Sequence, residues 1–406
     1  MNVFDKCFKE GGYLGMFRAA KDKYYTRPIL SLYPGTEMEF NGIKTIIWSL
    51  NNYLGLAEND EIKKIASEAA AEYGASAPMG SRMLTGNTVL HEKLEQKLAA
   101  FEEKESAILF NYGYLGVLGT LSAIVHRSDT IIIDKLSHAC MIDGTFLAGG
   151  KYRFYKHNDM NDLEKQLKTA NKLGKGGTLI VTEGVFGMRG DLANLPALCD
   201  LKDQYGARLF VDDAHGCGVM GPNGKGTPEH FGLMDRVDLY FSTFAKSFAA
   251  IGGFTTGDTE VIRYIRYNAR TQIFAKSLPM IYVKAVDATM DIIQKNPGFR
   301  TRLWEVAKKL QNGLREAGFH LGDIASPITP VYVPGEPEVA MTIIKYLREQ
   351  KGIFVSGVMY PVVPKGIILL RMIPTAAHTD EQIEKTLSAF RDLRDDFKLH
   401  LEKIKL

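Results

Sequence analysis

The chain has 406 residues, of which 45% are hydrophobic and 24% charged, and its formal net charge is +3. This composition is typical of a folded globular protein and excludes a largely disordered chain. The near balance of 50 basic and 47 acidic residues argues against a nucleic-acid-binding protein.

No apolar run reaches the roughly 18 residues that a membrane-spanning helix needs, and no secretory signal is visible. We therefore expect a cytoplasmic protein without a membrane span. The four cysteines form no CxxC pair, which argues against a structural zinc site and favours reduced thiols.

The first 50 residues are expected to form an N-terminal segment with a helix and a hairpin. Basic and aromatic residues alternate between positions 17 and 27, which favours an amphipathic helix packed on the body. Such a stretch can also contact a membrane surface peripherally or receive a carrier protein. Asn41-Gly42 separates the apolar runs Met38–Phe40 and Ile43–Trp48, which predicts a β-hairpin.

Short apolar runs alternate with helical patterns between about residue 60 and residue 290. This alternation predicts βαβ units and a mostly parallel sheet, in a large domain that spans residues 51–295. The predicted strands are Ser106–Phe110, Thr130–Ile133, Thr178–Thr182, Arg208–Val211 and Val237–Ser242. The predicted helices are Asp60–Tyr73, Leu90–Phe101 with Thr88 as its N-cap, Met160–Asn171 and Leu195–Tyr205.

The pattern changes near Asn296-Pro297-Gly298, where a smaller α+β domain covering residues 296–406 is expected to begin. Its predicted helices and strands are Phe299–Ala317, Thr329–Val333, Pro337–Gln350, Ile367–Met372 and Asp380–His400.

Polar residues follow two of the predicted strands, at the edge of a parallel sheet where ligands bind. Asp212, Asp213 and His215 follow one strand, and two carboxylates there are costly unless they are paired. The next residues match GxGxxG, but they run into a loop rather than a helix, which argues against a dinucleotide site. Lys246 follows the other strand among small residues, and desolvation there would lower its pKa and prepare the amine for reaction with a carbonyl.

A reactive lysine together with a carboxylate is the arrangement that holds pyridoxal phosphate (PLP). Asp212 is the candidate partner of the pyridinium nitrogen, His215 of the ring oxygen, and His138 can lie flat on the ring. The phosphate needs backbone amides at a helix N-terminus, and residues 111–116 open a helix after a strand. Thr243 can add a hydroxyl three residues before Lys246.

Several separated motifs resemble the α-oxoamine synthases, which are fold-type I PLP enzymes. The resemblance implies an α/β fold with a mostly parallel seven-stranded sheet, a smaller C-terminal domain and a homodimer with shared active sites. The motifs that carry it are NNYLGL (51–56), VDDAHGCG (211–218), GPNGKG (221–226) and TFAK (243–246).

The resemblance also implies a reaction and the residues that serve it. Lys246 would hold the cofactor and remove the α-proton of an amino acid, whose carbanion attacks an acyl thioester before CO₂ leaves. Arg371 would clamp the substrate carboxylate, with Asn51 beside it. The residues implied to bind the cofactor are His138, Asp212, His215, Gly113, Tyr114, Thr243 and Ser277.

The chain departs from the family pattern at two places. Gly187 replaces a usual serine, which removes one partner of the cofactor's ring oxygen. In the segment expected to reach the neighbouring subunit's phosphate, Ala275 replaces a common serine and Lys276 adds a cation. We expect Lys276, together with Arg82, to suit a second anionic group such as a sulfonate.

The choice of substrate is less closely defined by the sequence. Residues 360–366 resemble glycine C-acetyltransferase, whereas residues 80–82 and 268–271 favour a serine palmitoyltransferase-like or cysteate acyltransferase-like member. We expect serine or cysteate with a long-chain thioester of coenzyme A or an acyl carrier protein. The alternatives are glycine C-acetyltransferase, 8-amino-7-oxononanoate synthase, an aminotransferase, or a regulatory subunit, which would be expected to lack the lysine.

Overall fold

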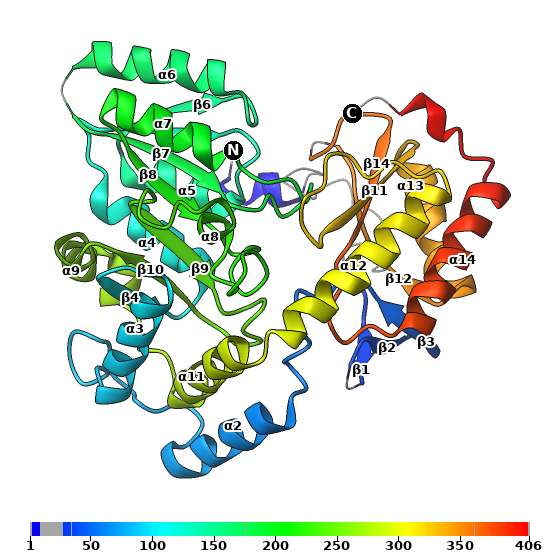
Figure 1. Cartoon of the computed structure of the whole chain (residues 1–406), viewed down its shortest axis with the longest axis horizontal. Helices are drawn as coiled ribbons and strands as arrows, with labels where there is room; N and C mark the ends of the chain where they lie inside the picture. The colour runs from blue at the N-terminus through cyan, green and yellow to red at the C-terminus, as the bar shows by residue number, and fades with distance from the viewer. Residues whose placement is uncertain (1, 9–26, 34, 175, 361, 405–406) are drawn as a thin grey trace.

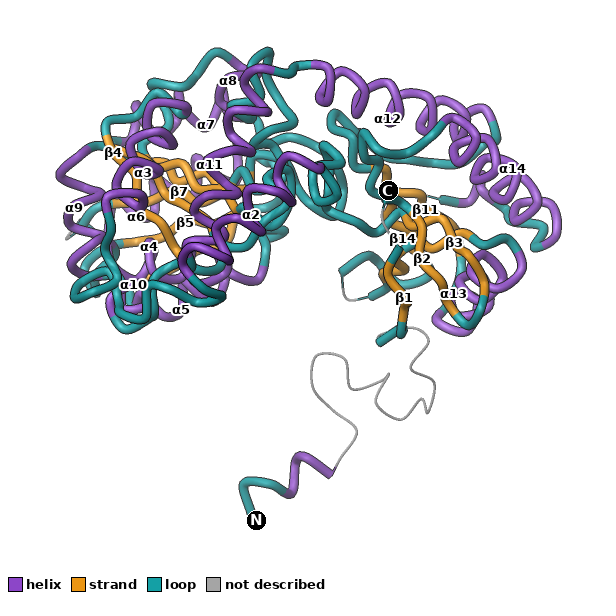
Figure 2. Tube along the Cα trace, turned by 90° about the horizontal axis from the view of Figure 1, so that it is seen from below, coloured by secondary structure: helices purple, strands orange, loops and turns teal. Residues whose placement is uncertain are grey.

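The computed structural model describes residues 2–8, 27–33, 35–174, 176–360 and 362–404. The basic and aromatic stretch predicted to form a helix lies almost entirely outside these residues. The described part forms a large lobe and a small lobe, which the long helix α12 (Gly298–Glu316) connects (Figures 1 and 2). None of the described helices is both long enough and apolar enough to cross a bilayer.

The large lobe is built on a seven-stranded sheet with the order β4-β10-β9-β8-β7-β5-β6. Only β10 runs antiparallel to its neighbours, so the mostly parallel seven-stranded sheet is confirmed. Its strands are β4 (Ser106–Phe110), β5 (Thr130–Asp134), β6 (Lys151–Tyr155), β7 (Thr178–Glu183), β8 (Arg208–Asp212), β9 (Leu239–Thr243) and β10 (Gly253–Gly257).

Helices cover both faces of this sheet because its central strands are apolar on both sides. Alternate residues of one strand enter different cores: Ile132 faces one side, whereas Ile131 and Ile133 face the other. The first core takes residues from α2 (Asp60–Tyr73), α3 (Val89–Phe101), α6 (Met160–Leu173), α7 (Leu195–Tyr205) and α11 (Met280–Lys295). The second core takes residues from α4 (Gly113–Ile124), α5 (Ala139–Ala148) and α9 (Thr259–Asn268). The large lobe also contains two short helices, α8 (Thr227–Phe231) and α10 (Arg270–Ile273).

The small lobe combines residues 30–47 with the C-terminal part of the chain. β1 (Leu30–Leu32), β2 (Glu37–Phe40) and β3 (Ile43–Ile47) form a sheet whose last strand pairs in parallel with β12 (Ile353–Phe354). A second sheet contains β11 (Thr329–Pro334), β14 (Ile367–Met372) and β13 (Ser356–Val358). Its helical segments are α13 (Pro337–Lys345), α14 (Asp380–Asp396), the π-helical turn η2 (Tyr346–Gln350) and the 3₁₀ turn η3 (Leu401–Lys403). The 3₁₀ turn η1 (Asp5–Phe8) near the N-terminus lies apart from this lobe (Figure 2). The boundaries at residues 50 and 295 stay predictions.

The predicted hairpin turn at Asn41-Gly42 and the predicted N-cap at Thr88 are both confirmed. Asn41 and Gly42 have φ angles of 52° and 77°, as a two-residue type I′ hairpin turn requires. Thr88 caps α3 by accepting a hydrogen bond from the His91 amide. The helix predicted over Pro337–Gln350 is instead interrupted at Tyr346, where its last turn widens into η2.

Candidate active site

The candidate site lies at the carboxyl ends of the parallel strands, where the strand pattern predicts it. Asp212 ends β8 and pairs in register with Glu183, which ends β7. Thr243 ends the neighbouring strand β9, and Lys246 follows it by three residues. Because these strands run in one direction, their polar last residues meet at one edge of the sheet.

Lys246 is the amine of the site. Burial lowers its pKa, while Asp212 and Glu183 act in the opposite direction. Burial raises the pKa of Asp212, and the cations of Lys246 and His138 oppose that rise. The carboxyl oxygens of Asp212 accept hydrogen bonds from the Ala214 amide at 3.1 Å and from the Cys140 thiol at 3.8 Å. The lysine therefore sits among acidic groups that counter the effect of its burial.

Asp213 has a different task from its neighbour. Its carboxyl group accepts hydrogen bonds from the Thr227 amide and hydroxyl and from the Tyr240 hydroxyl at 3.3 Å. A Cβ atom at Gly184 would lie only 2.1 Å from Asp213 Oδ1. Burial raises the pKa of Asp213 to about 6. Of the two adjacent carboxylates, Asp213 binds Thr227 and Tyr240, whereas Asp212 interacts with Lys246.

His138 stands at the N-cap of α5. Its Nδ1 accepts a hydrogen bond from the Cys140 amide at 3.2 Å and lies 3.0 Å from the Cys140 thiol. Burial lowers the pKa of His138, with Asp212 opposing and Lys246 reinforcing that effect. The imidazole is thus held by the backbone of its own helix, beside Asp212 and Lys246.

His215 is buried against the loop that contains Gly187. The Tyr53 hydroxyl lies 2.7 Å from His215 Nδ1, and burial holds the pKa of the imidazole well below its usual range. A Cβ atom on Gly187 would lie 2.4 Å from His215 Nε2. The imidazole therefore occupies the space that a side chain at position 187 would need.

Replacing Gly187 with serine, the usual family residue, is expected to push His215 away from Tyr53. We expect the free energy of unfolding to fall by about 1–3 kcal/mol, the usual effect of overpacking a core. Thermal unfolding and the affinity for PLP measure this effect. Gly298→Ser is the matched control because a Cβ atom there meets nothing within 4 Å. Equal stability of the two variants would contradict the crowding argument.

The N-terminus of α4 meets the end of β9. Its N-cap residue, Tyr112, makes no side-chain capping hydrogen bond, and a Cβ atom on Gly113 would lie 2.8 Å from Thr243 Oγ1. Only glycine at position 113 allows this close approach of the two segments. The approach brings the Thr243 hydroxyl next to the backbone amides at the N-terminus of α4, which suit an anion. The backbone amide of Tyr114 lies in the first turn of α4, where it has no acceptor within the helix, and the Tyr114 hydroxyl separately donates to Asp143.

Arg371 reaches the site from β14 of the small lobe. Its Nε donates to the Gly187 carbonyl at 2.6 Å, and burial lowers its pKa. Asn51 precedes the buried Tyr53, and its Oδ1 is buried without a hydrogen-bond partner in the described structure. A guanidinium and an unpaired amide oxygen are therefore both available for a polar ligand.

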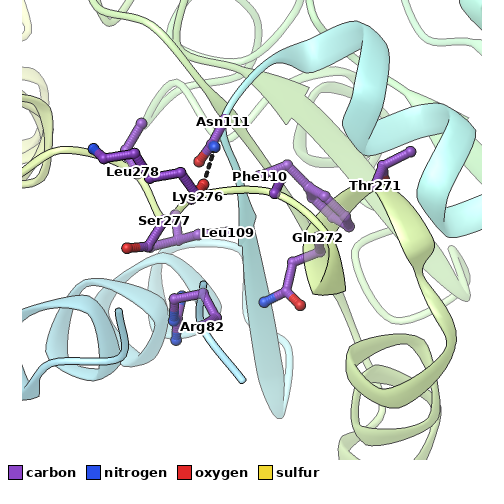
Figure 3. A pocket seen from close by; sticks show the side chains of 10 residues that line it. Arg82, Leu109, Phe110, Asn111, Thr271, Gln272, Lys276, Ser277 and Leu278 are labelled. Carbon is purple, nitrogen blue, oxygen red and sulfur yellow. Dashed lines mark hydrogen bonds between the residues drawn. The ribbon is translucent and has the colours of Figure 1, made fainter. Parts of the chain in front are cut away.

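A second small pocket contains Arg82, Lys276 and Ser277 (Figure 3). The Arg82 guanidinium makes two hydrogen bonds to Glu95, at 2.9 and 3.0 Å, and a third to Asn87 at 2.7 Å. Arg82 thus fastens its own loop to α3, and its expected role in substrate binding stays a prediction.

Lys276 and Ser277 lie in the loop between α10 and α11, beside that arginine. Asn111, which precedes α4, donates a hydrogen bond to the Lys276 carbonyl, and the Ser277 hydroxyl donates to the Gly80 carbonyl at 3.0 Å. The cavity volume is about 10 Å³, which is close to the space of one water molecule. Within a single chain this pocket is thus too small for a substrate.

Three site residues were missed from the sequence: Glu183, Tyr53 and Cys140. Burial and the neighbouring Asp212 raise the pKa of Glu183 to about 8. Glu183 directly follows the predicted strand Thr178–Thr182, and this position was a usable signal. Tyr53 lies in the motif at residues 51–56, and Cys140 lies two residues after His138.

The residues present fit PLP. Lys246 and Asp212 supply an amine and a carboxylate at neighbouring strand ends, and the α4 N-terminus with Thr243 forms a cradle closed by Gly113. An aldehyde, a ring nitrogen and a phosphate on one molecule match these three features.

Comparison with known proteins agrees with this interpretation. The aminotransferase class I and II family model matches residues 43–390. A cysteate-C-fatty acyltransferase from Capnocytophaga ochracea is 47% identical over 397 residues, 97% of this chain and 94% of that protein. An 8-amino-7-oxononanoate synthase from Alkaliphilus metalliredigens is 39% identical over 93% of this chain and 94% of that protein.

A solved structure shows the same fold. A serine palmitoyltransferase variant from S. paucimobilis, with PLP and myriocin bound, has a TM-score of 0.91 and 30% sequence identity, and the match covers 98% of this chain and 100% of that one. The chain therefore belongs to the aminotransferase class I and II family, as an α-oxoamine synthase, and is a PLP-dependent acyltransferase of fold type I.

Proposed function

We propose that this enzyme condenses cysteate or serine with a long-chain acyl thioester, with loss of CO₂, to give a 3-keto amine. The 47% identity to a cysteate-C-fatty acyltransferase over 97% of the chain is the observation that carries this proposal. The presence of Lys246, Asp212 and His138 at one sheet edge supports it. The reaction would be the first step in the synthesis of a sulfonolipid or a sphingolipid.

The chain's own residues have distinct tasks in this proposal. PLP, when bound, withdraws electrons from the substrate α-carbon. Lys246 Nζ would hold the cofactor and would act as the base that takes the α-proton of the amino acid. The Asp212 carboxylate would hold the protonated ring nitrogen, and His138 would contact the ring. His215 would bond the ring oxygen, while the amides of Gly113 and Tyr114 and the Thr243 hydroxyl would hold the phosphate.

The substrate's anionic groups need separate partners. Arg371 binds the α-carboxylate with its remaining guanidinium nitrogens, and Asn51 lies beside it. We assign Ser277 to a cofactor phosphate and Lys276, for which no ion pair is recorded among the described residues, to the sulfonate of cysteate. In the homodimer that we also propose, this segment would serve the neighbouring subunit, which fits the small size of its pocket within one chain.

A product-mass assay over glycine, serine and cysteate with short- and long-chain thioesters of coenzyme A and an acyl carrier protein tests this function. We expect long-chain 3-keto amines from cysteate or serine. Turnover with glycine and acetyl thioester alone would contradict the proposal, as would release of a keto acid without thioester consumption. The same assay identifies the donor, and sedimentation measures the oligomeric state.

Lys276→Met is expected to raise KM for cysteate about tenfold and to leave KM for serine unchanged. The lost ammonium–sulfonate contact is a charge-assisted hydrogen bond, worth roughly 1.5–3 kcal/mol. Steady-state kinetics with both amino acids measure the difference, and Lys276→Arg, which keeps the charge, is the control. An equal effect on serine would exclude a sulfonate-specific role.

A further inference from the structure

A buried ionic cluster lies beside the site, at the base of the loop that follows β7. His157 Nδ1 lies 3.1 Å from both carboxyl oxygens of Asp134, and its Nε2 lies 2.7 Å from Asp191 Oδ2. The side chains of His157, Asp134 and Asp191 are 11%, 0% and 14% exposed. None of these three residues takes part in the function proposed above.

The geometry requires His157 to be charged. Each ring nitrogen faces a carboxylate, which only accepts hydrogen bonds when ionised, so both nitrogens must carry a proton. Burial by itself lowers the pKa of His157, but the hydrogen bonds to Asp134 and Asp191 outweigh it and raise the pKa to about 9. The ring is a cation that joins two acidic side chains from separate segments.

The cluster fixes the loop of residues 184–192. Val185 forms a β-bridge with Leu192, and the Phe186 amide donates to the Asp191 carbonyl at 3.0 Å. The Phe186 ring packs edge-on against His157 at 4.4 Å between centroids. Asp191 therefore closes the base of the loop, and His157 ties that base to Asp134 at the end of β5.

The far end of the same loop contacts the small lobe. The Gly187 carbonyl accepts the hydrogen bond from Arg371 Nε at 2.6 Å, and the Gly187 amide donates to Glu183 Oε2 at 3.0 Å. The Gly190 carbonyl accepts from the Ala325 amide at 3.0 Å. A displacement of the loop base would thus move the acceptor that orients Arg371.

We propose that His157 is a positioning residue for amino-acid binding, which acts through Asp191 and the 184–192 loop to orient Arg371. This inference rests on the function proposed above, in which Arg371 binds the substrate carboxylate. Without the imidazolium, and within the described part of the chain, Asp134 would keep only the hydrogen bonds from the Leu136 and Asn158 amides, and Asp191 would keep only Arg189 at 3.5 Å. The two carboxylates would then repel each other with no cation between them. The loop base would then loosen, and the Gly187 carbonyl would no longer hold one orientation of the guanidinium.

His157→Gln removes the charge at similar size and tests the proposal. We expect KM for the amino acid to rise about tenfold, with kcat and KM for the thioester within about twofold of the wild-type values. In the cofactor-free protein, we expect faster hydrogen exchange at residues 184–192. The control is His126→Gln, which removes an exposed histidine that contacts Tyr264. Asp191→Asn keeps the shape of the loop base and should show the same effects if His157→Gln fails to fold.

Unchanged amino-acid KM and unchanged exchange in a folded variant would overturn the proposal. Equal losses for both substrates would also overturn it, because they indicate general destabilisation. If the exchange at residues 184–192 rises while an Arg371 variant keeps its amino-acid KM, the role of Arg371 fails and the link between His157 and the loop stands. The two failures are thus distinguishable.

The cluster also predicts a pH dependence of stability. Because the pKa of His157 is raised on folding, its contribution is fully present below about pH 6.5 and is lost as the pH rises through about 9. The difference in unfolding free energy between wild type and His157→Gln should therefore narrow over this range in denaturant titrations. A constant difference would contradict a charged His157. The titratable and charged groups around the ring are Asp134, Asp191, Arg189, Tyr155 and Tyr332.

Discussion

Replacing Lys246 with alanine is expected to abolish the visible absorbance band of the bound cofactor and to lower kcat about a thousandfold or more. One amine has two tasks here, covalent attachment of PLP and removal of the α-proton, so no second group in the site compensates for its loss. The variant should also raise the pKa of Asp212 and Glu183 further, because it removes the cation that opposes their burial.

Absorbance spectra, turnover and far-UV circular dichroism of the purified variant check this result. Lys151→Ala is the control because Lys151 is an exposed lysine on the edge strand β6. A folded Lys246→Ala enzyme that keeps its absorbance band and wild-type kcat would refute the assignment. Loss of helical signal in the variant would instead show that the amine is needed for folding, and Lys246→Arg then separates charge from chemistry.

Replacing Arg371 with lysine is expected to raise KM for the amino acid about 100-fold, equal to about 2.8 kcal/mol, while the cofactor band remains. A lysine keeps the positive charge, but it cannot present two parallel N–H groups to a carboxylate. It also loses the hydrogen bond that Arg371 Nε makes to the Gly187 carbonyl. Charge alone therefore does not restore binding.

Steady-state kinetics in both substrates, together with spectral titration by the amino acid, measure this effect. Arg263→Lys is the control because Arg263 is exposed on α9 and pairs only with Glu260 among the described residues. A change confined to the KM for the thioester would show that Arg371 serves the acyl donor instead. An unchanged amino-acid KM would remove Arg371 from the site.

The strand pattern led to Asp212, which directly follows an apolar run, and to Lys246, which lies three residues past the end of β9, because parallel strands place their ends together. Glu183 directly follows the predicted strand Thr178–Thr182 in the same way, but it was not singled out. β10 was missed because its sequence, Gly253–Gly257, has glycine at both ends and two threonines, although all five residues are buried. Burial by the surrounding helices overrides weak strand propensity at that position.

The sequence by itself determined the alternation of strands and helices, the mostly parallel sheet and the strand ends that bear the reactive groups. These features depend on periodicity and on local turns such as Asn41-Gly42, which a short stretch of chain contains. Only the tertiary structure decided that Asp213 binds Thr227 and Tyr240, that Arg82 is paired with Glu95, and that β3 joins β12. Such pairings join residues that are distant in sequence. A buried charged group has no water to stabilise it, so its stability depends on the partner that packing places beside it.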